Sequence, residues 1–172
     1  MKRRSFVAAA ALAGITGTAC SRVGGEFRTL SDAEGSTLAA LCAQIIPADD
    51  YPGADQAGAV RFIDIQLTRR YRIHRDRYRQ GLGTAETIAR ARFQRPIAVL
   101  TPEQQSLCTG LLEREAPEFF ALLLNHTMQS YYGSPRHGGN RDGVSYRMLG
   151  LYPVQVRGRE RSEVPQPGKA SS

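Results

Sequence analysis

Two consecutive helices are predicted by the stretch TPEQQSLCTGLLEREAPEFFALLLNHTMQSYY, residues 101–132. The segment Thr101-Pro102-Glu103-Gln104 combines an N-cap residue, a proline suited to the first helical turn and a glutamine that completes a capping box. Pro117 opens a second helix, whose apolar side chains recur at helical spacing as far as Tyr131. The stretch therefore predicts one helix that ends near Glu115 and another that follows at once.

Three more helices are predicted before this stretch. A second capping box at Ser31-Asp32-Ala33-Glu34 starts a helix that Pro47 ends. After a loop that runs to Gly58, apolar spacing predicts a long helix over 59–81 and a further one over 84–93. The second half of the long helix is rich in arginine. An arginine-rich helix face suits a protein partner, an anionic membrane or water, and the sequence leaves all three open. The arginines are Arg69, Arg70, Arg72, Arg75, Arg77 and Arg79.

No stretch of useful length alternates apolar and polar residues as a strand would. We therefore expect an all-α protein, a single small bundle of four or five helices over residues 31–156 with a long glycine-rich loop near its C-terminal end. The charged, proline-bearing residues 157–172 are expected to be a disordered tail.

The glycine-rich loop lies between two apolar segments and reads YYGSPRHGGNRDGVSY over residues 131–146. Its four glycines permit turns that side chains forbid, and aromatic and charged residues are interleaved with them. Loops with this composition are frequent recognition elements. The loop is therefore the strongest candidate binding element of the chain.

The first 19 residues resemble an export signal. Arg3 and Arg4 precede a weakly apolar, alanine-rich run that is about half the ~20 residues a membrane-spanning helix needs. The arginine pair favours the twin-arginine route over general secretion. Cys20, after Ala19, leaves two outcomes open, ordinary cleavage or lipidation of Cys20, and residues 20–30 are expected to be a tether.

Much of the basic charge belongs to this signal. The full chain has a formal net charge of +7, and removing residues 1–19 takes away three basic and no acidic side chains, which leaves +4. The composition of the remaining chain gives little support to nucleic-acid binding.

Two cysteines remain in the helical part, Cys42 and Cys108. Both lie in apolar helical stretches, so buried free thiols are the simpler interpretation. Export to an oxidising compartment keeps a Cys42–Cys108 disulfide open as an alternative.

No self-contained catalytic or metal-binding motif is present. The three histidines, His74, His126 and His137, lie far apart and form no HExxH pattern, and no GxSxG motif occurs. If the chain were an enzyme or a cofactor-binding protein on its own, His126, His137 and Asp142 would be its only plausible site. The absence of such motifs favours an interaction protein.

The chain resembles the gluconate 2-dehydrogenase subunit 3 family. The resemblance rests on Tyr131–Gly143, on Leu41–Ala54 with its Ile45-Ile46-Pro47 helix end and acidic loop, and on Thr101–Gln105. It covers about residues 30–153.

The resemblance implies a non-catalytic small subunit that binds, co-exports and stabilises an FAD-dependent dehydrogenase of the glucose–methanol–choline type, which oxidises a sugar or sugar acid. It implies no cofactor on this chain, FAD on the large partner, and haem c on a multihaem cytochrome c that receives the electrons. The location would be the periplasm, reached by the twin-arginine route. Membrane association would be indirect or through Cys20.

On this interpretation the glycine-rich loop is an interface, and the partner-binding residues are expected to be Tyr131, Tyr132, Arg136, His137, Asn140, Arg141 and Asp142. Tyrosines supply rigid contact area, and arginines pair with carboxylates through two parallel hydrogen bonds. Two alternatives stay open: an internal pair of Arg141 with Asp142 that fixes the loop, and a left-handed turn position as the only role of Asn140.

Overall fold

The structure is a computed structural model that describes residues 27–151. Within that range the regular secondary structure is all helical, the helices are joined by turns and loops, and there is no strand. The helices are α1 (Asp32–Ile45), α2 (Ala59–Leu67), α3 (Arg75–Phe93), α4 (Pro102–Glu115), α5 (Pro117–Tyr132) and α6 (Val144–Met148), with single 3-10 turns at Arg72–His74, Ile97–Val99, Pro135–His137 and Arg141–Gly143. The expected all-α fold is confirmed; the short α6 adds one helix to the five that were predicted.

Both predicted capping boxes are present. The Ser31 hydroxyl accepts from the Glu34 N–H, and the Glu34 carboxylate accepts from the Ser31 N–H at 2.8 Å. Thr101 and Gln104 make the same reciprocal pair at the start of α4. Pro117 lies in the first turn of α5, as predicted. These helix starts were predictable because each capping box depends on residues only three positions apart, and the effect of Pro117 depends on that residue alone.

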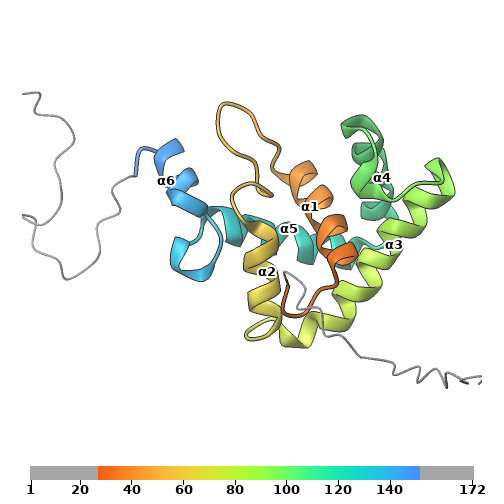
Figure 1. The fold of residues 1–172 in the computed structure, drawn as a ribbon, viewed down its shortest axis with the longest axis horizontal. Helices are drawn as coiled ribbons and strands as arrows, with labels where there is room; N and C mark the ends of the chain where they lie inside the picture. Colours follow the sequence, from red (N-terminus) through yellow and green to blue (C-terminus); the bar gives the residue numbers. More distant parts are fainter. Residues whose placement is uncertain (1–26, 152–172) are drawn as a thin grey trace, which may run out of the picture.

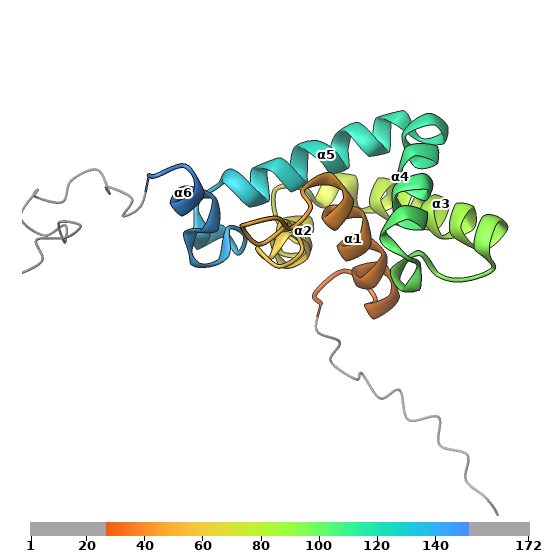
Figure 2. The same ribbon diagram turned by 90° about the horizontal axis from the view of Figure 1, so that it is seen from above.

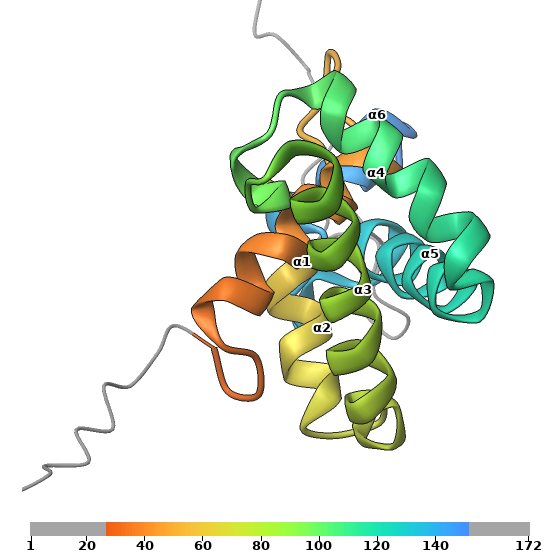
Figure 3. The same cartoon turned by 90° about the vertical axis from the view of Figure 1, so that its right-hand side faces the viewer.

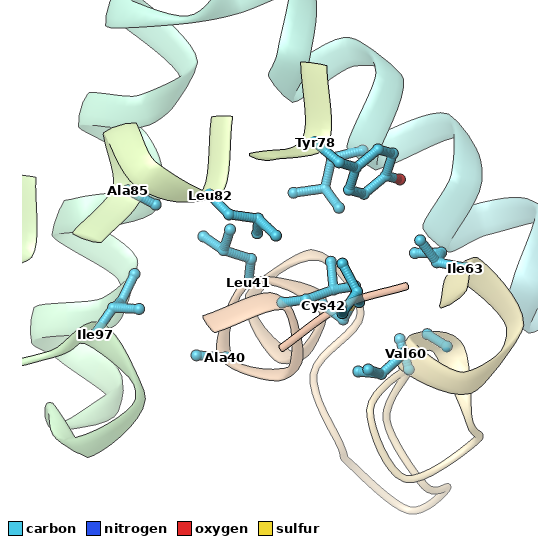
Figure 4. Close-up of a cluster of buried hydrophobic side chains, with 14 of the residues drawn as sticks. Ala40, Leu41, Cys42, Val60, Ile63, Tyr78, Leu82, Ala85 and Ile97 are labelled. Carbon is cyan, nitrogen blue, oxygen red and sulfur yellow. The ribbon is translucent and has the colours of Figure 1, made fainter. Parts of the chain in front are cut away.

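Helix α1 is central to the bundle, because α2, α3, α4 and α5 all pack against it. Figure 4 shows Leu41 and Cys42 of α1 between Val60 and Ile63 on one side and Tyr78, Leu82 and Ala85 on the other. Figure 2 shows α5 along the length of the molecule, from α4 to the end that carries α6. The glycine-rich loop is therefore presented at one end of the bundle (Figure 1).

The prediction of one continuous helix over 59–81 is wrong. Helix α2 ends at Leu67, and the chain turns back there, so that α2 and α3 are joined at one end (Figure 3) and diverge from it (Figure 1). The Thr68 hydroxyl bonds the Ile65 carbonyl at 2.7 Å, and the Arg75 side chain bonds the Leu67 carbonyl at 2.7 Å. Side chains thus satisfy carbonyls that a continuing helix would have used.

The predicted separate helix over 84–93 is also wrong, because it forms one helix with residues 75–83. Gly81 lies inside α3 with the ring of Phe119 against it, at a place where a β-carbon would come within 2.2 Å of that ring. Gly81 therefore permits close packing of α5 on α3 and does not end the helix.

The last part of the predicted tether, residues 27–30, is held on the bundle. The backbone N–H groups of Arg28, Thr29 and Leu30 donate to the buried carboxylate of Asp64 at 2.8, 2.8 and 3.1 Å. Leu30 is buried in the core. The folded domain therefore begins several residues earlier than predicted. Three predicted features fall outside the described residues: the signal with Arg3 and Arg4, lipidation at Cys20, and the tail 157–172.

The Cys42–Cys108 disulfide, kept open from the sequence, is not formed. Both thiols are free and buried. The Cys42 Sγ contacts the Thr127 hydroxyl at 3.5 Å, and burial raises the pKa of the Cys42 thiol to about 12. Cys42 is a packing residue of the core.

Candidate docking site

The part of the glycine-rich loop that follows α5, residues 133–143, packs its backbone closely on α5 and on α2. At Gly139 a β-carbon would come within 2.4 Å of the Ser130 carbonyl oxygen of α5. At Gly138, where φ is 99°, it would meet the Ile65 side chain of α2 at 3.0 Å. Glycine is required at Gly139 because no side chain fits between the loop and α5, and at Gly138 because residues with a side chain rarely adopt so positive a φ. The Arg141 N–H adds a hydrogen bond of 2.9 Å to the Ala57 carbonyl before α2.

Asn140 holds the loop together from inside. It is 0% exposed and has φ 44°, in the left-handed region. Its amide nitrogen donates to the Gly133 carbonyl at 2.8 Å, and its amide oxygen accepts from the Ser145 N–H at 3.0 Å. The prediction that Asn140 contacts a partner is therefore wrong, and the left-handed turn role that was kept open is correct.

Tyr131 is also not available to a partner. It is 3% exposed, and its hydroxyl donates to the Pro52 carbonyl at 2.9 Å. This bond ties the end of α5 to the loop between α1 and α2. Its neighbour Tyr132 is 39% exposed and packs edge-on against the Tyr131 ring. The two adjacent tyrosines differ because successive helix positions point about 100° apart.

The remaining predicted residues lie on the surface. Arg136, His137, Arg141 and Asp142 are all exposed. No Arg141–Asp142 ion pair occurs among the described residues, so the loop-fixing pair that was kept open is not formed. Asp142 has φ 56°, and its backbone carbonyl, not its carboxylate, accepts from the Arg147 guanidinium.

A groove of about 380 Å³ runs beside the loop, and five arginines line it. We call it the arginine groove; its arginines are Arg28 before α1, Arg61 and Arg69 of the α2 segment, and Arg136 and Arg141 of the loop. Asp142 is its one carboxylate. Neither Arg28 nor Arg61 was predicted as a site residue, although Arg61 lies one helical turn before Ile65, which lines the same groove.

A second groove, of about 530 Å³, lies on the other side of His137, which lines both. We call it the aromatic groove, because Phe62, Tyr71 and Tyr132 line it. Met128, at its edge, is 42% exposed. The end of the bundle that carries the loop therefore presents a basic and an apolar depression side by side.

The arginines of segment 69–79 do not share one face. Arg69 lines the arginine groove and Arg70 the aromatic groove. Arg77 pairs with Glu118 at 3.5 Å and Arg79 with Asp76 at 3.2 Å, both on the surface. The helix break at residues 68–74 separates the two sets.

His126 lies in the interior, behind the aromatic groove. Its ring stacks on Tyr71 with 3.7 Å between ring centroids, and its Nδ1 is 2.9 Å from the Tyr78 hydroxyl. Burial, with a smaller contribution from His74, lowers the pKa of His126 to about 4. Burial likewise raises the pKa of Tyr78 well above its usual value. The pair is therefore neutral near pH 7.

This geometry does not assemble the three residues expected for a stand-alone enzyme. His137 and Asp142 line the arginine groove, whereas His126 is 4% exposed in the core. His74 and His126 do approach each other, with ring centroids 5.6 Å apart. Across residues 27–151 no three histidine, cysteine or acidic side chains are grouped so that they could hold a metal ion. In the same part of the chain no helix has the length and apolar character to cross a bilayer.

Fold and site together define a small all-helical protein with a closely packed glycine-rich loop flanked by a basic and an aromatic groove. The chain belongs to the gluconate 2-dehydrogenase subunit 3 family, whose family model matches residues 32–153. No curated protein and no solved structure matches the chain. The resemblance found in the sequence is thus confirmed at the level of the family.

Proposed function

We propose that this chain is a non-catalytic small subunit that binds and stabilises an FAD-dependent dehydrogenase for a sugar or sugar acid. The family it belongs to takes its name from a dehydrogenase subunit. The observation that carries the proposal is the glycine-rich loop: its backbone is fixed on α2 and α5, while Tyr132, Arg136 and His137 face outward. A rigid loop with exposed aromatic and arginine side chains loses little conformational entropy on docking and supplies the residue types frequent in interface hot spots.

The flavin belongs to the large partner on this proposal, and a multihaem cytochrome c receives the electrons. The two-arginine signal at Arg3-Arg4 carries the folded pair to the periplasm. Cys20 remains the point at which lipidation would add a membrane anchor.

Association is tested by co-expression with an FAD-dependent dehydrogenase of the glucose–methanol–choline type from the same organism. The tagged chain should capture a protein that contains FAD and reduces a dye acceptor with a sugar or sugar acid. Tyr132→Ala and Arg136→Ala should each weaken the complex by roughly tenfold. If the purified chain alone oxidised the substrate, the non-catalytic role would be wrong.

Export is tested separately. Replacing Arg3 and Arg4 by lysine should leave both the chain and its partner in the cytoplasm. Undiminished dehydrogenase activity in the periplasm would contradict co-export, without bearing on association.

A further inference from the structure

The arginine groove gathers five guanidinium groups against the one carboxylate of Asp142. None of the five makes an ion pair within residues 27–151, although Arg77, Arg79 and Arg90 elsewhere on the surface do. Asp32 and Asp55 share a neighbouring cavity with Arg61 and Arg141 but do not pair with them. Like charges in one groove repel each other, and an anionic occupant relieves that repulsion.

The backbone beneath the groove is anchored before any ligand binds. The Arg28 N–H bonds the Asp64 carboxylate at 2.8 Å, and the Arg141 N–H bonds the Ala57 carbonyl at 2.9 Å. The Arg136 guanidinium bonds the Ser134 hydroxyl at 3.2 Å. Asp64 lines an adjoining cavity, and both of its carboxylate oxygens already accept backbone hydrogen bonds. Anchoring of this kind reduces the entropy lost on binding.

Arginine identifies the chemistry of the occupant. A planar guanidinium pairs with a carboxylate through two parallel hydrogen bonds, whereas a lysine offers only a point charge. The loop wall of the groove carries Gly138 and Gly139, which have no side chains, so a second backbone can approach. The groove is concave, which suits an inserted chain segment better than a flat membrane surface.

The aromatic groove extends this recognition. His137 lines both depressions, so an occupant that leaves the arginine groove past His137 meets Phe62 and Tyr132. Such an occupant carries carboxylates followed by an aromatic or aliphatic side chain.

We propose that the arginine groove binds an acidic segment of the dehydrogenase partner, with an adjoining apolar side chain in the aromatic groove. This inference rests on the proposed function and adds the chemistry of the contact. Arg61 and Arg141 are the residues expected to hold the acidic segment, because they lie on two different walls of the groove: Arg61 on α2 and Arg141 on the loop.

The test compares two double variants of equal charge in the complex with the dehydrogenase. Arg61→Gln with Arg141→Gln removes the groove charges, and Arg72→Gln with Arg95→Gln removes two exposed arginines outside it. The groove variant should bind the dehydrogenase roughly 100-fold more weakly, and the control should change by less than about threefold. Arg61→Lys with Arg141→Lys should fall between them, since the charge stays and the planar fork is lost. Unchanged melting temperatures establish that the variants are folded.

Three probes separate the sources of the negative charge: a synthetic ten-residue peptide rich in Asp and Glu with one Phe, inorganic phosphate, and phosphatidylglycerol vesicles. We expect the peptide to bind the unmodified chain and not the groove variant, and phosphate and vesicles to bind weakly and alike to both. Equal dehydrogenase affinity of the groove variant and the control would overturn the inference while leaving the proposed function intact. Vesicle binding that only the groove variant loses would overturn it in favour of a membrane. If the unmodified chain formed no complex with the dehydrogenase, the proposed function itself would fail.

Discussion

The side-chain amide of Asn140 donates to the Gly133 carbonyl at 2.8 Å and thereby closes the loop that carries Arg136 and His137. The same amide accepts from Ser145 at the start of α6. One buried side chain thus joins the end of α5, the loop and α6. The shape of the candidate docking surface therefore depends on a residue that is itself fully buried.

Asn140→Ala should destabilise the protein by about 2–4 kcal/mol. The change leaves the Gly133 carbonyl and the Ser145 N–H without partners and places alanine in a left-handed conformation. The free energy of unfolding from urea titration measures the effect. Asn125→Ala, an exposed amide on α5, is the control and should cost less than about 1 kcal/mol. Equal effects of the two changes would show that Asn140 does not hold the loop.

Two glycines of α3 should respond in opposite directions to the same substitution. At Gly81 a β-carbon would lie 2.2 Å from the Phe119 ring, whereas at Gly83 it would meet nothing within 4 Å. Gly81→Ala should therefore destabilise by about 1–3 kcal/mol through overpacking. Gly83→Ala should stabilise by about 0.5–1 kcal/mol through helix propensity. The melting temperatures of the two variants decide this, and a shift of the same sign in both would contradict the packing of α5 on α3.

Stability should fall as the pH drops from about 6.5 to 4. The pKa of His126 is lowered from 6.5 to about 4 in the folded protein, so in this range the unfolded chain binds the proton more readily. The contribution of His126 is complete above pH 6.5 and lost as the pH falls through 4. We expect a loss of about 1–2 kcal/mol, less than the full shift implies because solvent near His74 screens part of the charge.

Urea titrations across this pH range measure the effect. His126→Gln should remove most of the slope, since glutamine does not titrate. His137→Gln, a change in the exposed loop, should leave it in place. If the free energy of unfolding of His126→Gln still fell with pH as it does in the unmodified protein, the pH dependence would come from other groups.

Cys42 and Cys108 should resist alkylation in the folded protein. Both are buried, and the pKa of the Cys42 thiol is raised to about 12, so hardly any thiolate forms at pH 8. After unfolding in urea without a reductant, iodoacetamide should modify both residues, as located by peptide mass spectrometry. Failure to modify them without a reductant would mean that a disulfide is present.

Much of the fold could be predicted from short-range patterns. The capping boxes at Ser31 and Thr101, and Pro117 in the first turn of α5, act within one helical turn, so their effect does not depend on the rest of the chain. The break after Leu67 was not predicted, because the bond that satisfies the Leu67 carbonyl comes from the Arg75 side chain on the far side of a chain reversal. Helical spacing alone does not reveal such a reversal.

The amino-acid sequence by itself determined the helical class, most helix starts and the family, and it pointed to the glycine-rich loop as the candidate binding element. Only the tertiary structure decided which loop residues face outward: Tyr131 and Asn140 are buried, whereas Tyr132 and Arg136 are exposed. Only the tertiary structure also brought Arg28 and Arg61 beside Arg141. The physical reason is the range of the forces. Hydrogen bonds within a turn connect neighbours in sequence, whereas burial and the gathering of distant charges follow from how the helices pack.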